Sequence, residues 1–249
     1  MIFEVCCGCT EDAINAYKGG ADRIELNSSL FLGGLTPSVG TLRLVKKETD
    51  FPVMCMVRPR EGGFCYSDTE YETMKEDAKL LLENGADGLV FGFLHADGTI
   101  DVERTKEFIA ICGDKEKVFH RAIDVTPDLI ESTKLLSSLG ITRVLTSGGK
   151  PTVMEGADVI KVMLAVAGDM QILPGGSIRQ NNVEEIVEKT GVNQVHASMR
   201  KLHYDTSTRL RPEIFFGGMI DGKFIPEDEV KITDPVQVAA MKATLDSIK

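Results

Sequence analysis

Short runs of β-forming residues alternate with amphipathic segments along the whole 249-residue chain. The expected strands are Phe3–Cys7, Arg23–Asn27, Val53–Arg58, Gly88–Leu94, Val118–Asp124, Arg143–Ser147, Gln171–Gly175 and Gln194–Ser198. This alternation is typical of βα units that build a parallel sheet. Eight such units match the roughly 250 residues of a (β/α)8 barrel. Because no linker-like stretch divides the chain, the sequence predicts one TIM-barrel domain over residues 1–249.

A glycine stands three residues before each even-numbered strand, and this weak repeat indicates which way the strand side chains point. The four glycines are Gly20, Gly85, Gly140 and Gly191, each placed as the glycine that ends a helix. Side chains alternate between the two faces of a strand, so alignment on the glycines separates the faces. One face is apolar and is expected to meet the helices; it carries Ile24, Leu26, Leu89, Val144 and Val195.

The opposite face is expected to point into the barrel, where alternate strands contribute to each layer. From bottom to top, the even strands give Arg23, Gly88, Arg143 and Gln194, then Glu25, Val90, Leu145 and His196, then Asn27, Gly92, Ser147 and Ser198. On the odd strands the same alternation directs Glu4, Cys6, Arg58, His120 and Asp124 inward. Unpaired buried charges are costly, so these groups must pair with one another or surround something bound.

The height of each polar residue in the barrel suggests its role. For the low-lying Glu4, Arg23 and Arg143 we predict a structural ion-pair network. Barrel active sites form at the C-terminal ends of the strands, and the residues expected there are Arg58, His120, Asp124, His196 and Ser198. Glu25 shares a layer with His196, so its carboxylate could orient the imidazole for acid–base chemistry. The alternative for each histidine is a satisfied core residue.

Two segments suggest anion binding at the mouth. Arg58 and Arg60 end the third strand before a glycine-rich loop, and Arg58 could form a bidentate clamp for a carboxylate or phosphate. The alternative is that Arg58 pairs with an interior carboxylate. Gly175 and Gly176 follow the seventh strand, where backbone N–H groups often hold phosphate, although tight turns favour glycine in any case. Arg60, Ser147, Gly175, Gly176 and Ser198 therefore form a candidate ligand-binding set.

The cysteines gather at the end of the first strand, where Cys6, Cys7 and Cys9 occur within four residues. Thiolates are soft ligands that suit Cu(I) or zinc. A single cluster lacks the second ligand pair that a structural zinc site needs. The three cysteines are therefore candidate ligands for Cu(I).

Charge and hydropathy exclude several partners. The net charge of −10 disfavours nucleic acid and anionic membrane surfaces. No apolar run reaches the roughly 20 residues of a membrane span, and the N-terminus lacks the pattern of a signal peptide. We expect a cytoplasmic protein with reduced thiols. The long segment Met199–Ile232 could cross the mouth, make a subunit contact or form a solvated basic loop.

Several ordered motifs resemble those of the CutC family of copper-homeostasis proteins. They include Glu4–Cys6, Ala21–Leu26, Gly33–Ser38, Val57–Arg60, Phe64–Ser67, Phe119–Ala122 with Asp124, Arg143–Gly148, Pro174–Gly176 and His196–Ser198. The resemblance implies a (β/α)8 barrel, an intracellular location, Cu(I) binding and a homo-oligomer. The family's proposed copper site uses cysteines that end strands one and two. The first matches Cys6, but Asn27 stands at the second position.

Three functions remain open from the sequence. The first is copper homeostasis, with Cu(I) bound by Cys6 and either Cys7 or Cys9. The second is an enzyme acting on a small anionic metabolite, with Arg58 as anion clamp, His120 or His196 as acid–base group, and Glu25 or Asp124 as orienter. The third is a barrel that binds a small molecule without turnover.

Overall fold

The computed structural model describes residues 1–217, 219–220, 223–224 and 226–248, and it contains a ring of parallel strands. The strands are β1 (Ile2–Cys7), β2 (Arg23–Leu26), β3 (Val53–Met56), β4 (Gly88–Phe91), β5 (Glu116–Phe119), β6 (Arg143–Thr146), β7 (Gln171–Pro174) and β8 (Gln194–Ala197). They are ordered β7-β6-β5-β4-β3-β2-β1-β8. A parallel bridge between Gly175 and His196 joins β7 to β8 and closes the ring. The predicted TIM barrel is confirmed.

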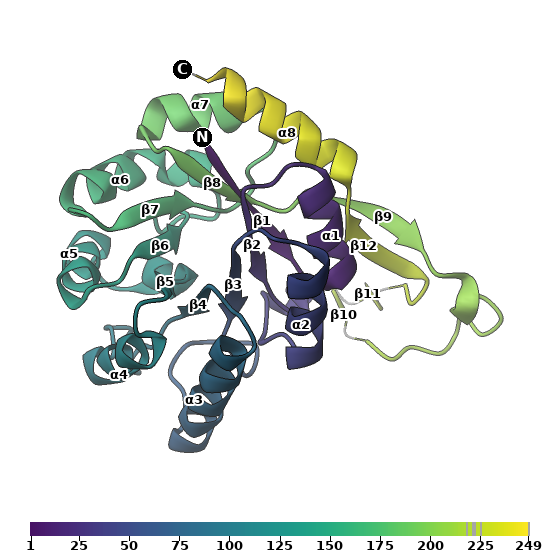
Figure 1. Cartoon of the computed structure of the whole chain (residues 1–249), viewed down its shortest axis with the longest axis horizontal. Helices are drawn as coiled ribbons and strands as arrows, with labels where there is room; N and C mark the ends of the chain where they lie inside the picture. The colour runs from purple at the N-terminus through teal and green to yellow at the C-terminus, as the bar shows by residue number, and fades with distance from the viewer. Residues whose placement is uncertain (218, 221–222, 225, 249) are drawn as a thin grey trace.

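Helices surround the strands (Figure 1). They are α1 (Thr10–Lys18), α2 (Val39–Glu48), α3 (Asp68–Glu83), α4 (Val102–Cys112), α5 (Leu129–Leu139), α6 (Val153–Val166), α7 (Val183–Thr190) and α8 (Pro235–Ser247), with a 3-10 turn, η1 (Leu30–Leu32), after β2. The strand residues predicted to face the helices are fully buried in the main apolar core between the two layers; they are Ile24, Leu26, Leu89, Val144 and Val195. The period-two pattern thus identified the outer face correctly.

The barrel interior is divided into an apolar part and a polar part. Met54, Met56, Val90 and Val118, on β3 to β5, form a small apolar cluster separate from the main core. The inward side chains of β1, β2 and β8 are polar instead. A closed barrel fills its interior with side chains. The polar groups of β1, β2 and β8, together with Arg143 of β6 and Gln171 of β7, therefore lie beside this apolar cluster.

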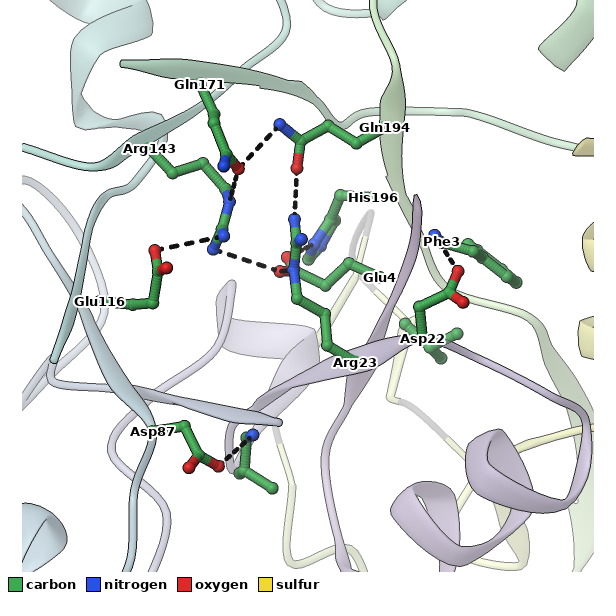
Figure 2. Close-up of polar contacts among 12 residues, drawn as sticks. Phe3, Glu4, Asp22, Arg23, Asp87, Glu116, Arg143, Gln171, Gln194 and His196 are labelled. Atoms are coloured by element: carbon green, nitrogen blue, oxygen red, sulfur yellow. Dashed lines mark hydrogen bonds and ion pairs between the residues drawn. The ribbon is translucent and has the colours of Figure 1, made fainter. Parts of the chain in front are cut away.

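An ion-pair network fills the N-terminal end of the polar part (Figure 2). Glu4 accepts a hydrogen bond from Arg23 Nε at 2.5 Å and lies 4.0 Å from Arg143 Nη1. Arg23 Nη2 donates to Gln194 Oε1 at 2.6 Å, and Arg143 Nε donates to Gln171 Oε1 at 3.0 Å. The predicted structural network of Glu4, Arg23 and Arg143 is therefore confirmed.

The fifth strand is shorter than predicted. The sequence suggested Val118–Asp124, but β5 ends at Phe119 and a 3-10 helix, η2 (Arg121–Val125), follows. The turn forms because His120 Nδ1 accepts a hydrogen bond from the Ala122 N–H at 3.2 Å. Asp124 consequently does not lie on an inward strand position, and this part of the prediction was wrong.

The segment after β8 forms a two-stranded ribbon. β9 (Arg200–Tyr204) pairs antiparallel with β12 (Glu229–Thr233), and between them lie η3 (Thr206–Thr208), β10 (Met219–Ile220) and β11 (Lys223–Phe224). Figure 1 shows the ribbon projecting from the barrel on the side of α1. Asp12 of α1 anchors its base by accepting the Thr233 N–H at 2.6 Å. A role for this ribbon as a subunit contact stays a prediction.

Replacing Glu4 with glutamine is expected to destabilise the protein strongly. The change leaves the buried Arg23 without its carboxylate, while Arg143 keeps its 3.2 Å ion pair with Glu116. Breaking a buried pair in this way costs about 3–5 kcal/mol. The free energy of unfolding in urea, measured for Glu4→Gln and the parent protein, checks the loss. Glu72→Gln is the matched control, because Glu72 is 67% exposed in its ion pair with Lys75; its free energy of unfolding should barely change. Equal small losses in both variants would contradict the proposed importance of the network.

Candidate functional site

Three chemically different side chains meet at the middle of the barrel. Cys6 from β1, Glu25 from β2 and His196 from β8 each offer a ligand atom, and these atoms all lie within 4.8 Å of one another. The strand order β8-β1-β2 makes the three side chains neighbours. Cys6 pairs in register with Glu25, and the Cys6 Sγ lies 3.8 Å from Glu25 Oε1. The predicted proximity of Glu25 and His196 is thus observed.

A cavity of about 230 Å³ opens at the C-terminal mouth beside this cluster. Cys6 and His196 line its wall, together with Gly175, Gly176 and Ser198. The remaining lining comes from β6, from the end of β8, from the start of β9 and from the segments after β2, β5 and β7. It consists of Leu30, Gly33, Arg121, Leu145, Ser177, Ile178, Arg179, Ala197 and Arg200. Sequence reasoning missed Arg121 and Arg179 as site residues, although both follow a barrel strand within five positions.

Glu4 holds His196 in place. The Glu4 Oε1 lies 2.8 Å from His196 Nδ1 (Figure 2). Burial opposes ionisation of Glu4, but the charge of Arg23, the hydrogen bond with His196 and the charge of Arg143 outweigh it and hold the pKa of Glu4 far below its ordinary value. An ionised carboxylate can only accept, so Nδ1 carries a proton and Nε2 is the nitrogen left for chemistry. The orienting role predicted for Glu25 therefore falls to Glu4.

The cluster binds protons tightly. Burial raises the pKa of the Cys6 thiol and of the Glu25 carboxyl. Burial alone would lower the pKa of His196, but the charge of Glu25 and the hydrogen bonds with Cys6 and Glu4 raise it well above the ordinary value. Among the described residues, Glu25 Oε2 is buried with no hydrogen-bond partner. The arrangement can store and deliver protons, or bind a cation after releasing them.

Asn27 occupies the position of the second family cysteine and contacts the same cluster. Its Nδ2 donates to Glu25 Oε1 at 2.9 Å and lies 3.6 Å from the Cys6 sulfur. The amide is a donor where a second thiolate would be a metal ligand. A metal bound by Cys6 in this chain therefore needs a different second ligand, and His196 is the nearest imidazole.

The structure does not bring Cys7 or Cys9 to Cys6. Cys7 is fully buried in the apolar core on the opposite face of β1, with its sulfur 3.6 Å from the Val5 carbonyl oxygen. Cys9 is the N-cap of α1, and its sulfur accepts the Asp12 N–H at 3.4 Å. Adjacent residues on a strand point in opposite directions, so the Cys7 side chain points away from that of Cys6. Cys9 lies beyond the strand, at the start of α1.

Arg58 and Arg60 bind their own loop. Buried Arg58 donates to the carbonyl oxygens of Leu32, Gly34 and Gly62 at 2.7–3.1 Å. Arg60 forms an ion pair with Glu70 and donates to the Gly63 carbonyl at 3.1 Å. Neither arginine lines the mouth cavity. Their part in anion binding stays a prediction that this geometry does not support, because their terminal guanidinium nitrogens already donate to loop carbonyl oxygens and neither side chain reaches the cavity.

His120 is buried away from the cavity lining. Its Nδ1 accepts the Ala122 N–H, so the proton of the neutral ring is on Nε2. Burial and the charge of Arg58 lower its pKa to about 3, which keeps the ring neutral.

Asp124 accepts the Ser147 and Gly149 N–H groups at 3.0 and 3.1 Å. Arg121 donates to both Asp124 and Ser147, at 2.8 and 2.6 Å, so Asp124 and Ser147 position Arg121 at the cavity.

The two buried histidines should titrate in opposite directions, and NMR of 15N-labelled imidazoles in the metal-free protein checks this. His196 should stay doubly protonated as the pH rises through 6.5, whereas His120 should stay neutral until the pH falls toward about 3. His196→Gln and His120→Gln assign the signals.

The same pKa shifts make stability depend on pH. Because its pKa is raised in the folded protein, His196 adds stability that is fully present below about pH 6.5 and is lost as the pH rises through the pKa of the folded state. His120 instead costs stability as the pH falls below about 6.5. Titration of the assigned His196 and His120 signals together near pH 6.5 would contradict the described environments.

Comparison with known proteins places the chain in a family. The family model described as CutC matches residues 1–201. A CutC family protein of Treponema denticola is 56% identical over 231 residues, which are 92% of this chain and 93% of that protein. A human copper homeostasis protein cutC homolog is 41% identical over 250 residues, covering all of this chain and 90% of that protein. The crystal structure of CutC from Streptococcus agalactiae superposes with a TM-score of 0.75 at 33% identity, covering 79% of this chain and 97% of that one. In the described ranges no helix is both long and apolar enough to cross a membrane. The chain belongs to the CutC family.

Proposed function

We propose that this protein acts in copper homeostasis by binding Cu(I) through Cys6 and His196. The observation that carries the proposal is the convergence of the Cys6, Glu25 and His196 ligand atoms within 4.8 Å. The choice of copper comes from relatives such as the human copper homeostasis protein cutC homolog. Binding inside the cell fits six cysteines that are all free thiols.

The donor set suits Cu(I) better than a hard cation. Thiolate and imidazole are ligands that copper prefers, whereas calcium and magnesium take oxygen ligands. Cys6 supplies the thiolate, and His196 supplies Nε2, because Glu4 engages Nδ1 at 2.8 Å. A carboxylate that fixes the far nitrogen of a ligand histidine is a common supporting feature of metal sites. Glu25 adds negative charge beside the cation.

Copper binding at this site must displace protons. The Cys6 thiol and the His196 imidazolium both hold their protons more tightly than the free side chains do. A metal ligand must be deprotonated, so the affinity for Cu(I) should rise with pH. The Cys6 position at the cavity wall gives the ion an entry path from the mouth.

Cys6→Ser and His196→Gln should each lose most of the Cu(I) affinity. Removal of a supporting group typically costs roughly 10–100-fold in metal affinity, and removal of a ligand should cost more. Anaerobic competition with a chromophoric Cu(I) chelator, repeated from pH 6 to pH 8, measures the affinity and its expected rise with pH.

Cys9→Ser is the matched control, because it also removes one thiol but keeps an oxygen that can cap α1. Its Cu(I) affinity should equal that of the parent protein. Unchanged affinity in Cys6→Ser would eliminate Cys6 as a ligand, and a loss in Cys9→Ser equal to that in Cys6→Ser would contradict a site formed by Cys6 and His196 without Cys9.

A further inference from the structure

The mouth cavity is lined by cationic side chains although the protein is anionic. Three arginines line it, namely Arg121, Arg179 and Arg200, and its described lining includes no aspartate or glutamate. The chain as a whole carries a net charge of −10. A cation site would be expected to concentrate carboxylates at its entrance. Arginines gathered in a cleft instead raise the local concentration of anions.

The three arginines come from the loops after three different strands. Arg121 follows β5, Arg179 follows β7, and Arg200 begins β9 after β8. Asp124 and Ser147 hold Arg121 through hydrogen bonds of 2.8 and 2.6 Å. Arg179 donates to the Ile178 carbonyl oxygen at 2.7 Å. In the part of the chain that the structure describes, neither Arg179 nor Arg200 forms an ion pair with a carboxylate. Among the described residues, their guanidinium charges therefore lack a counter-ion.

Backbone donors occur at the same place. In the glycine-rich turn after β7, Gly176 and Ser177 have φ angles of 137° and 60°. Ser177 is one of two non-glycine residues with positive φ in the described chain, a conformation that costs free energy and tends to occur at functional sites. Within the same described residues, the N–H groups of Ser177 and Ile178 donate to no other group. In barrels of this type, the loops after strands seven and eight frequently bind phosphate.

We propose that the mouth cavity binds the phosphate group of a small phosphate monoester, held by Arg121, Arg179 and Arg200. Guanidinium groups match phosphate oxygens through paired N–H donors, and three of them suit a dianion better than a single carboxylate. The volume of about 230 Å³ is below the roughly 300–1,000 Å³ of sites for drug-sized ligands, so the organic part is small. It would lie against Cys6 and His196, which share the cavity wall. This site is built from residues other than the copper ligands.

Isothermal titration of the chelator-treated, metal-free protein with inorganic phosphate and with glycerol 3-phosphate tests the proposal. Both should bind to the parent protein with one site per chain. Arg179→Gln and Arg200→Gln should each weaken the binding at least about tenfold, which corresponds to about 1.4 kcal/mol. Arg43→Gln is the matched control, because Arg43 is exposed on α2 and the same unit of charge is removed. Its affinity should match that of the parent protein.

The outcomes separate the phosphate site from the copper site. Cys6→Ser should lose Cu(I) affinity and keep its affinity for inorganic phosphate, whereas Arg200→Gln should do the reverse. Absence of phosphate binding in the parent, or equal weakening in Arg43→Gln and Arg200→Gln, would overturn the proposal. Tighter binding of succinate than of either phosphate compound would overturn the choice of phosphate. Circular dichroism of each variant confirms that the fold is retained, so that a lost affinity is attributable to the site.

Discussion

One buried carboxylate connects the stability of this barrel with its chemistry. Glu4 accepts a hydrogen bond from Arg23 at 2.5 Å on one side and contacts His196 Nδ1 at 2.8 Å on the other. The arginine network keeps Glu4 ionised, and the ionised carboxylate in turn fixes the tautomer and orientation of the imidazole. The low-lying ion pairs are therefore more than a means of filling a polar interior. They lie below the cluster of Cys6, Glu25 and His196, and Glu4 connects them to the cavity through its contact with His196.

The geometry of a β-strand decides which thiol can take part. Cys6 and Cys7 are adjacent in sequence, yet Cys6 lines the cavity and Cys7 is fully buried against the helices. Cys9 lies beyond the strand and caps α1. The three cysteines that are close in sequence therefore lie in three different environments. In the proposed copper site the second ligand is the imidazole from β8, because neighbouring strands bring inward residues together across the sheet. Asn27, at the position of the family's second cysteine, contacts Cys6 as a hydrogen-bond donor instead.

The mouth combines two kinds of side chain in a small space. The cluster below it offers soft and proton-binding ligands, whereas the rim carries arginines without a carboxylate in the described lining. A cationic rim does not attract free copper ions, but it does attract anions and anionic carriers of a metal. The proposed copper and phosphate sites use different side chains, so the protein can be tested for each of them separately. The sequence also suggested Arg58 as an anion clamp and His120 as an acid–base group. Arg58 instead donates to loop carbonyl oxygens, and His120 accepts the Ala122 N–H at the start of η2.

The sequence by itself determined the eight-fold strand–helix order, the inward and outward faces of the strands, and the sharing of one layer by Glu25 and His196. These features follow from local rules, because side-chain direction alternates with a period of two and helix ends carry their own signals. Tertiary structure decided the rest. It made Glu4 the partner of His196, turned the chain after Phe119 so that Asp124 supports Arg121, and engaged Arg58 with carbonyl oxygens of nearby loops. It also gathered three arginines from separate loops around one cavity. The reason is that loop conformations and long-range hydrogen bonds depend on partners far away in the sequence, and no local pattern records which donor meets which acceptor.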